Sequence, residues 1–120
     1  MKILIVEDSP TMRRIIRNTL KRIGYEDVEE AEDGVEGVSV LGNSNIDFII
    51  TDWNMPKMSG LDFIKQVKSK PEYAEVPVLM VTTRSVENDV KEALTAGAAS
   101  YIVKPFTPQV LKEKMDTILN

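Results

Sequence analysis

The chain alternates short, continuous apolar runs with stretches whose apolar residues recur at helical spacing. The runs are ILIV at 3–6, FII at 48–50, VLMV at 78–81 and YIV at 101–103, with a weaker, half-polar run at 28–31. Continuous runs are typical of strands buried on both faces, as in a parallel sheet. The stretches that follow them each carry one apolar stripe, which predicts amphipathic helices. The pattern predicts an α/β fold of five β-α units, with right-handed crossovers and helices on both faces of the sheet.

Local signals predict where the helices begin and end. Ser9 and Pro10 suit the N-cap and first residue of the first helix, and Gly24 suits its end. The stripe of the fourth helix comprises Val86, Val90, Ala93 and Leu94. Further element ends are predicted at Gly42, Pro71, Gly97 and Pro105.

Composition narrows the class of protein. A length of 120 residues without a linker or repeat predicts one domain spanning 1–120. The chain has no cysteine and no histidine, so any chemistry must come from carboxylates, hydroxyls, lysine or a bound cation. A net charge of −4 argues against a nucleic-acid partner, and no apolar stretch approaches the roughly 20 residues of a membrane span. We expect a cytoplasmic protein.

Polar side chains follow four of the five predicted strands. They are Glu7 and Asp8 after the first, Asp52 after the third, Thr82 and Thr83 after the fourth, and Lys104, which precedes Pro105, after the fifth. Singly, each has an ordinary explanation, such as acids at a helix N-terminus or a solvated lysine. In open parallel sheets, however, ligands bind outside the carboxyl ends of the strands. Their shared position at that edge favours a functional site.

The predicted cluster of three carboxylates calls for a cation. Two like charges about 4 Å apart repel by about 4 kcal/mol at an effective dielectric constant near 20. An oxygen-only, partly hydrated site selects Mg²⁺, for which Mn²⁺ can substitute. With a metal and a lysine to neutralise phosphoryl oxygens, a carboxylate can be the nucleophile that forms an acyl phosphate. Asp52 is the best candidate because it stands alone at the end of a central strand.

Two phosphate-handling classes of similar layout fit less well. The first β-α turn, EDSP, has no glycine and cannot form a dinucleotide or P-loop phosphate cradle. Haloacid-dehalogenase-type phosphatases place a second aspartate two residues after their nucleophile. Asn54 stands there in this chain and cannot act as a general acid. We therefore do not expect an enzyme beyond slow loss of its own phosphoryl group, and an aspartyl-phosphate phosphohydrolase is a lesser alternative.

Three segments carry a resemblance to a known family. They are SPTMRRIIRNTL with the acid pair before it, TDWNMPKMSG, and YIVKPFTPQVL. With these motifs the chain resembles the receiver domain of bacterial two-component response regulators, most of all the single-domain chemotaxis type. The resemblance covers nearly the whole length. It implies a flavodoxin-like (βα)5 fold with strand order 2-1-3-4-5.

The resemblance also implies residue roles. Asp52 would accept a phosphoryl group from a phosphohistidine. Asp8, Asp52 and the backbone carbonyl of Asn54 would bind Mg²⁺, with Glu7 contributing directly or through water. Lys104 would pair with the phosphoryl oxygens or, before phosphorylation, with Asp52. Thr82 and Tyr101 would form the switch, with Tyr101 moving from an outward to an inward position. Supporting residues would be Trp53, as a neighbour of the site more than a core residue, Thr83, and Pro105 in a cis peptide bond with Lys104.

The resemblance further implies partners. The phosphodonor would be a CheA-like histidine kinase, and the expected target is a FliM-like flagellar motor switch protein. A phosphatase is a further expected partner. The target surface would include Lys91, Tyr101, Val103, Phe106 and Lys114. We expect a monomer without nucleic-acid or membrane partners, and a complete protein rather than a receiver domain from a longer regulator with a DNA-binding or enzymatic output, which is the main alternative.

Glu7 departs from the family pattern, which usually has two aspartates after the first strand. The extra methylene moves the carboxylate by about 1.5 Å. We therefore expect an altered but retained Mg²⁺ site.

Overall fold

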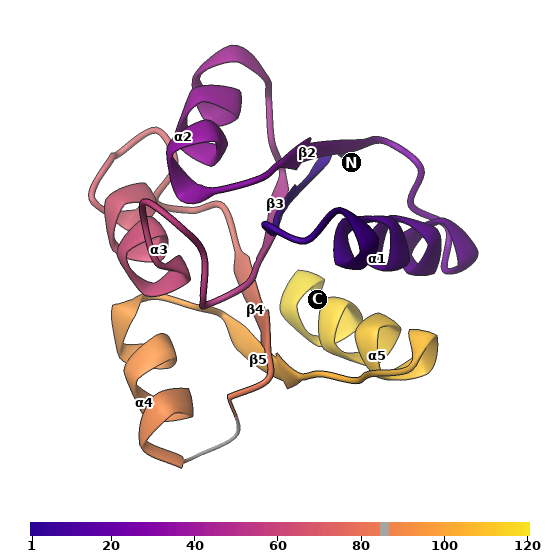
Figure 1. Ribbon diagram of the computed structural model, residues 1–120. Coiled ribbons are helices and arrows are strands. Elements are labelled where there is room, and N and C mark those ends of the chain that lie inside the picture. The colour runs from indigo at the N-terminus through magenta and orange to yellow at the C-terminus, as the bar shows by residue number, and fades with distance from the viewer. Residues whose placement is uncertain (85–86) are drawn as a thin grey trace.

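The computed structural model describes residues 1–84 and 87–120, and Val86 of the predicted fourth stripe lies outside them. The described residues form five strands and five helices in strict alternation (Figure 1). The strands are β1 (Ile3–Val6), β2 (Val28–Ala31), β3 (Phe48–Thr51), β4 (Val78–Thr82) and β5 (Ser100–Val103). The helices are α1 (Pro10–Arg22), α2 (Gly34–Asn43), α3 (Gly60–Lys68), α4 (Glu87–Ala96) and α5 (Pro108–Leu119). The predicted alternation is confirmed, including the weak second strand.

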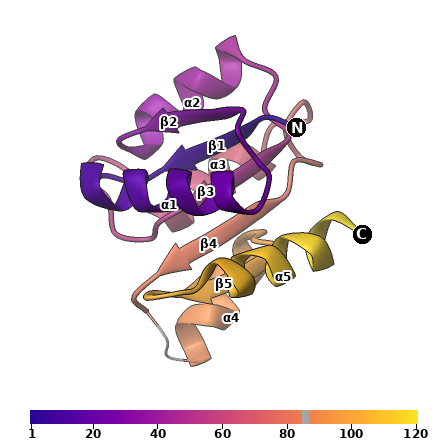
Figure 2. The same cartoon turned by 90° about the vertical axis from the view of Figure 1, so that its right-hand side faces the viewer.

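All five strands pair in parallel, in the order β2-β1-β3-β4-β5. Helices α1 and α5 cover one face of the sheet, and α2, α3 and α4 cover the other (Figures 1 and 2). This is the predicted flavodoxin-like (βα)5 fold. The strand order reverses between β1 and β3, so their carboxyl ends border the crevice where such sheets bind ligands.

The core consists of two layers, one on each side of the sheet. Leu4, Val6 and Ile49 face the α2–α4 side, whereas Ile3 and Ile5 face the α1–α5 side. Every residue of β1, β3 and β4 is buried. This two-sided burial explains why their sequences are continuous apolar runs rather than alternating ones.

Side-chain capping hydrogen bonds mark where four of the helices begin. The side chains of Ser9, Asp33, Ser59 and Thr107 each accept a hydrogen bond from the backbone N–H three residues on. The predicted end of α1 is confirmed, since Gly24 follows it with a φ of 103°. The predicted end at Gly42 is wrong, because α2 continues to Asn43. A glycine inside a helix is tolerated at a cost of about 1 kcal/mol.

Asp33 supports a stability prediction. Its Oδ1 accepts the Glu36 N–H at 2.8 Å, and this bond, with Lys57 nearby, lowers the pKa of the buried Asp33 carboxyl. We expect Asp33→Ala to lower the free energy of unfolding by about 1–2 kcal/mol at pH 7. A lowered pKa stabilises the fold above the ordinary value of 3.8, and this is lost as the pH falls through the folded value. Urea unfolding should show a difference in free energy of unfolding between the wild type and Asp33→Ala that is smaller at pH 3 than at pH 7. Equal stability of the two proteins at pH 7 would contradict the capping role.

Candidate phosphoacceptor site

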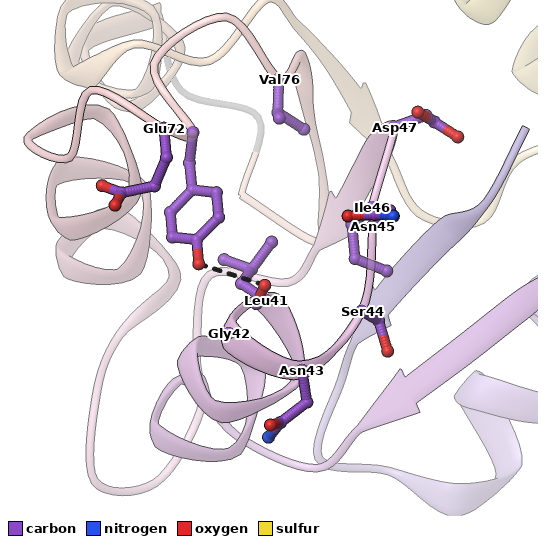
Figure 3. Close-up of a pocket in the computed structure, with 10 residues that line it drawn as sticks. Leu41, Gly42, Asn43, Ser44, Asn45, Ile46, Asp47, Glu72 and Val76 are labelled. Atoms are coloured by element: carbon purple, nitrogen blue, oxygen red, sulfur yellow. Dashed lines mark hydrogen bonds between the residues drawn. The ribbon is translucent and has the colours of Figure 1, made fainter.

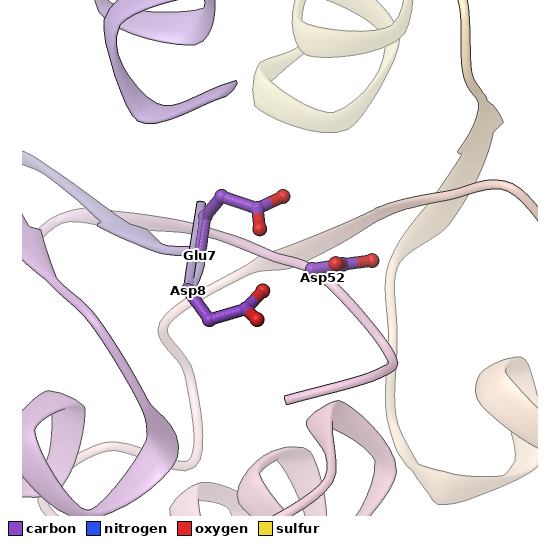
Figure 4. A group of neighbouring side chains, drawn as sticks. All are labelled: Glu7, Asp8 and Asp52. Carbon is purple, nitrogen blue, oxygen red and sulfur yellow. The ribbon is translucent and has the colours of Figure 1, made fainter. Parts of the chain in front are cut away.

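Three carboxylates meet at the carboxyl edge of the sheet (Figure 4). Glu7 and Asp8 directly follow β1, and Asp52 directly follows β3. These strands are neighbours, with Val6 paired to Thr51. One oxygen from each carboxylate lies within 4.8 Å of the other two. The predicted convergence of these three side chains is confirmed.

Lys104 brings the opposite charge from β5 to this cluster. Its Nζ lies 2.6 Å from Glu7 Oε1 and 3.5 Å from Asp52 Oδ2. The resemblance implied pairing with Asp52, and the structure adds a closer contact with Glu7. The longer side chain of glutamate reaches the ammonium, whereas Asp52 keeps the looser contact.

The Glu7 side chain is almost completely buried. It is 2% exposed, and its Oε2 accepts the Ser9 N–H at 3.1 Å. Burial raises the pKa of Glu7, although the hydrogen bonds from Lys104 and Ser9 act in the opposite direction. The negative charge of Glu7 is therefore costly even with its lysine partner.

This raised pKa predicts a pH dependence of stability. A carboxyl group with a higher pKa in the folded state binds more protons there, so its stabilising contribution is lost as the pH rises from 4.5 through the raised value. In metal-free buffer, the wild-type free energy of unfolding should fall relative to that of Glu7→Gln over this range. Denaturant unfolding of both proteins from pH 4.5 to 8 measures the difference, and parallel curves would contradict the assignment.

Asp52 is held by the backbone around it. Its Oδ1 accepts the Trp53 N–H at 2.7 Å, and its own N–H donates to the Val6 carbonyl at 3.0 Å. The Gly60 N–H donates to the Trp53 carbonyl at 2.7 Å. A Cβ on Gly60 would lie 1.8 Å from the Asp52 carbonyl oxygen. Gly60 thus lets the start of α3 touch the residue that carries the site, a role that sequence reasoning missed.

Trp53 corrects a prediction. The indole was expected to be a neighbour of the site more than a core residue, but it is 6% exposed and packs within the α2–α4 core layer. Met55 and Met58 pack against the same layer. The loop after Asp52 folds over the sheet edge, so its apolar side chains are buried although the chain has left the strand.

Arg84 is a further residue that sequence reasoning missed. Its guanidinium lies 4.6 Å from the centroid of the Trp53 ring, and its Nη2 donates to the Asn54 side-chain oxygen at 3.2 Å. Its Nη1 lies 3.6 Å from an Asp89 carboxylate oxygen in α4. The available signal was a basic residue two positions after the strand-end Thr82.

The switch residues of the resemblance lie beside this arginine. Thr82 is fully buried, and its Oγ1 accepts the Arg84 N–H at 3.3 Å. Tyr101 is 8% exposed, and its hydroxyl donates to the Arg84 carbonyl, which is the inward position. Thr83 is exposed, and the Lys104–Pro105 peptide bond is cis, as expected.

The predicted target surface is only partly exposed. Lys91, Val103 and Lys114 are exposed. Phe106 is half-buried and packs against the core layer on the α1–α5 side, so less of its ring is available to a partner. Leu94 and Val110 add exposed apolar side chains on α4 and α5.

A hollow of about 650 Å³ lies away from the carboxylates (Figure 3). It is lined by residues 41–47, before β3, and by Glu72, Tyr73 and Val76, before β4. The Tyr73 hydroxyl donates to the Leu41 carbonyl at 3.1 Å across its wall. The hollow is thus at the amino edge of the sheet, opposite the candidate site.

Within the described ranges, no helix has the length and apolar character to cross a membrane.

The carboxylate cluster fits a hard divalent cation by the chemistry of its donors. Glu7, Asp8 and Asp52 offer only oxygen, the ligand type that Mg²⁺ prefers. Among residues 1–84 and 87–120 this is the one acidic group with such spacing. Asp8 and Asp52 are the more accessible pair, because Glu7 is engaged by Lys104.

Comparison with known proteins agrees with this fold. The model of the response regulator receiver domain matches residues 3–116. The chain therefore belongs to the response regulator receiver domain family, the signalling switches of two-component systems.

Within the family, the chain is of the CheY type. It is 57% identical over 120 residues to the chemotaxis protein CheY1 of Helicobacter pylori, covering 99% of this chain and 97% of the relative. It is 54% identical to a CheY homologue of Campylobacter jejuni, covering 99% and 92%. The crystal structure of CheY4 of Vibrio cholerae superposes with a TM-score of 0.90 at 38% identity, covering 98% and 97%.

Proposed function

We propose that residues 1–120 act as one receiver domain in which Asp52 accepts a phosphoryl group from a histidine kinase. The observation that carries this proposal is the position of Asp52. It lies at the carboxyl edge of the sheet, with one oxygen each of Glu7 and Asp8 within 4.8 Å of its carboxylate and the Lys104 ammonium 3.5 Å away. A carboxylate nucleophile needs such flanking groups to handle the charge of a phosphoryl group.

In the proposed reaction, a carboxylate oxygen of Asp52 forms a bond to phosphorus as the P–N bond of the donor phosphohistidine breaks. The electron pair of that bond stays on the donor imidazole. Lys104 pairs with a phosphoryl oxygen once this oxygen competes with Glu7 for the ammonium. Mg²⁺, or Mn²⁺ in its place, would be held by Asp8, Asp52 and the backbone carbonyl of Asn54, and would neutralise phosphoryl charge. Glu7 contributes by holding Lys104 and completing the negative site.

Phosphorylation then acts through Thr82 and Tyr101. The Thr82 hydroxyl donates to the phosphoryl group, and the inward position of Tyr101 is favoured with it, because a ligand shifts a population only through better contacts in one state. The target binds the face that includes Lys91, Val103, Phe106 and Lys114. The names of the relatives support a role in chemotaxis. As the family resemblance implies, the proposed donor is a CheA-like kinase, the proposed target is a FliM-like motor switch protein, and the proposed location is the cytoplasm.

Incubation with acetyl phosphate and Mg²⁺, followed by intact-protein mass spectrometry, tests the proposal. We expect one phosphoryl group per wild-type chain and none on Asp52→Asn. Asp47→Asn is the matched control, because Asp47 precedes the same strand at the opposite edge and should leave labelling unchanged. Labelling of Asp52→Asn to the wild-type extent would refute the proposal, and rapid continuous release of phosphate would indicate a phosphohydrolase instead.

A further inference from the structure

Arg84 contacts both halves of the proposed switch. Its side chain contacts Trp53 and Asn54, the two residues after the phosphoacceptor. Its backbone contacts Thr82 and Tyr101, the two residues proposed to respond. One residue therefore joins the loop that carries the phosphoryl group to the residues that change position.

The side-chain contacts hold Arg84 from three directions. The planar guanidinium stacks over the indole of Trp53, which is itself buried and therefore fixed. One nitrogen reaches the side-chain oxygen of Asn54, and another faces Asp89 in the first turn of α4. A lysine could keep the charge opposite Asp89 but has no plane to stack and no fork to bridge two oxygens.

The backbone contacts transmit that position to the switch. The Arg84 carbonyl is the acceptor for the hydroxyl of the inward Tyr101, and the Arg84 N–H donates to the Thr82 hydroxyl oxygen. The stacking of the Arg84 side chain on Trp53 fixes where the Arg84 carbonyl lies. A buried phenol without its acceptor is unfavourable, so the inward position of Tyr101 depends on the carbonyl being in place.

We propose that Arg84 is a positioning residue that couples the loop after Asp52 to Tyr101. Resting on the proposed function, this assigns Arg84 a task distinct from phosphoryl chemistry: it holds the acceptor of the inward tyrosine in register with Trp53 and Asn54. Loss of its side chain leaves the carbonyl and N–H present but untethered. The inward population of Tyr101 should then fall by about fivefold or more relative to the outward one, as expected for loss of a stacking contact and an ion pair.

Spectroscopy of the unphosphorylated protein tests the proposal through two independent probes. The chain has one tryptophan and three tyrosines, so indole fluorescence reports on Trp53, and the Tyr101 ring signals are assigned by comparison with Tyr101→Phe. In Arg84→Ala we expect stronger acrylamide quenching of Trp53 and Tyr101 ring signals shifted toward an exposed environment. Arg84→Lys should be intermediate. Arg22→Ala, which removes an arginine from the last turn of α1, should match the wild type.

A merely structural role would give a different result. If Arg84→Ala lowers the melting temperature but leaves the Tyr101 ring signals as in the wild type, the proposal is overturned. It is also overturned if Arg84→Lys and Arg84→Ala give the same Tyr101 spectrum as the wild type. Because these probes need no phosphorylation, failure of acetyl phosphate to label Asp52 would defeat the proposed function and not the coupling by Arg84.

Discussion

Replacing Gly60 by alanine is expected to destabilise the protein by about 3 kcal/mol or more and to slow phosphorylation of Asp52 by about 100-fold. The added Cβ would lie 1.8 Å from the Asp52 carbonyl oxygen and 2.9 Å from the Trp53 Cα. Both neighbours are backbone, so relief requires the loop or the start of α3 to move. Movement of the Asp52 backbone displaces the carboxylate from Lys104, 3.5 Å away.

Gly42→Ala is the matched control for this substitution. In the described structure, a Cβ added at Gly42 would lie more than 4 Å from every atom other than those of its chain neighbours and the nearby backbone of its own helix. The residue is inside α2. Alanine there should raise stability by about 0.5–1 kcal/mol and leave phosphorylation unchanged. Urea unfolding and labelling rates measure both effects. A Gly60→Ala protein as stable and as quickly labelled as the wild type would show that the close approach has no structural role.

The second large effect is expected from Lys104→Met in metal-free buffer. The variant leaves Glu7 buried without its ammonium partner, so the fold must keep an unpaired charge or take up a proton. One pKa unit corresponds to about 1.36 kcal/mol. Protonating Glu7 at pH 7, about 2.5 pH units above its ordinary pKa of 4.5, therefore costs about 3.4 kcal/mol, and this is the upper limit of the destabilisation that the unpaired charge can cause. At pH 5 the same limit is below about 1 kcal/mol. Destabilisation should therefore be large at pH 7 and small at pH 5.

The double variant Glu7→Gln/Lys104→Met separates this mechanism from lost packing. With the buried charge removed, loss of the lysine should cost much less at pH 7, giving a coupling energy of at least about 1 kcal/mol in a double-mutant cycle. If Lys104→Met costs the same free energy of unfolding in the wild-type background as in the Glu7→Gln background, the ion pair of Lys104 with Glu7 does not contribute to stability.

The β-α alternation and the convergence of most candidate site residues were predictable for one physical reason, whereas the strand order rested on the family resemblance. Continuous apolar runs identify strands buried on both faces, and the carboxyl ends of parallel strands meet at one edge. The residues that follow the runs must then converge, as Asp8, Asp52 and Lys104 do. No knowledge of loop paths is needed for this step.

The features that were missed depend on loop paths and side-chain choices. Trp53 looks exposed in sequence because it follows a strand end, but its loop folds over the α2–α4 core layer. The closer contact of Lys104 with Glu7 depends on the reach of one additional methylene in the glutamate side chain. Arg84 lies in an ordinary loop by sequence, and only the three-dimensional structure shows that its guanidinium meets the Trp53 indole and the Asp89 carboxylate.

We expect Asp52, and no other carboxylate of the cluster, to carry the phosphoryl group. Borohydride reduction of the protein labelled with acetyl phosphate and Mg²⁺ converts an aspartyl phosphate to homoserine, which peptide mass spectrometry can locate. The predicted result is homoserine at position 52 alone, dependent on both acetyl phosphate and Mg²⁺. Reduction at Glu7 or Asp8 instead, or an unmodified Asp52 in fully labelled protein, would contradict it.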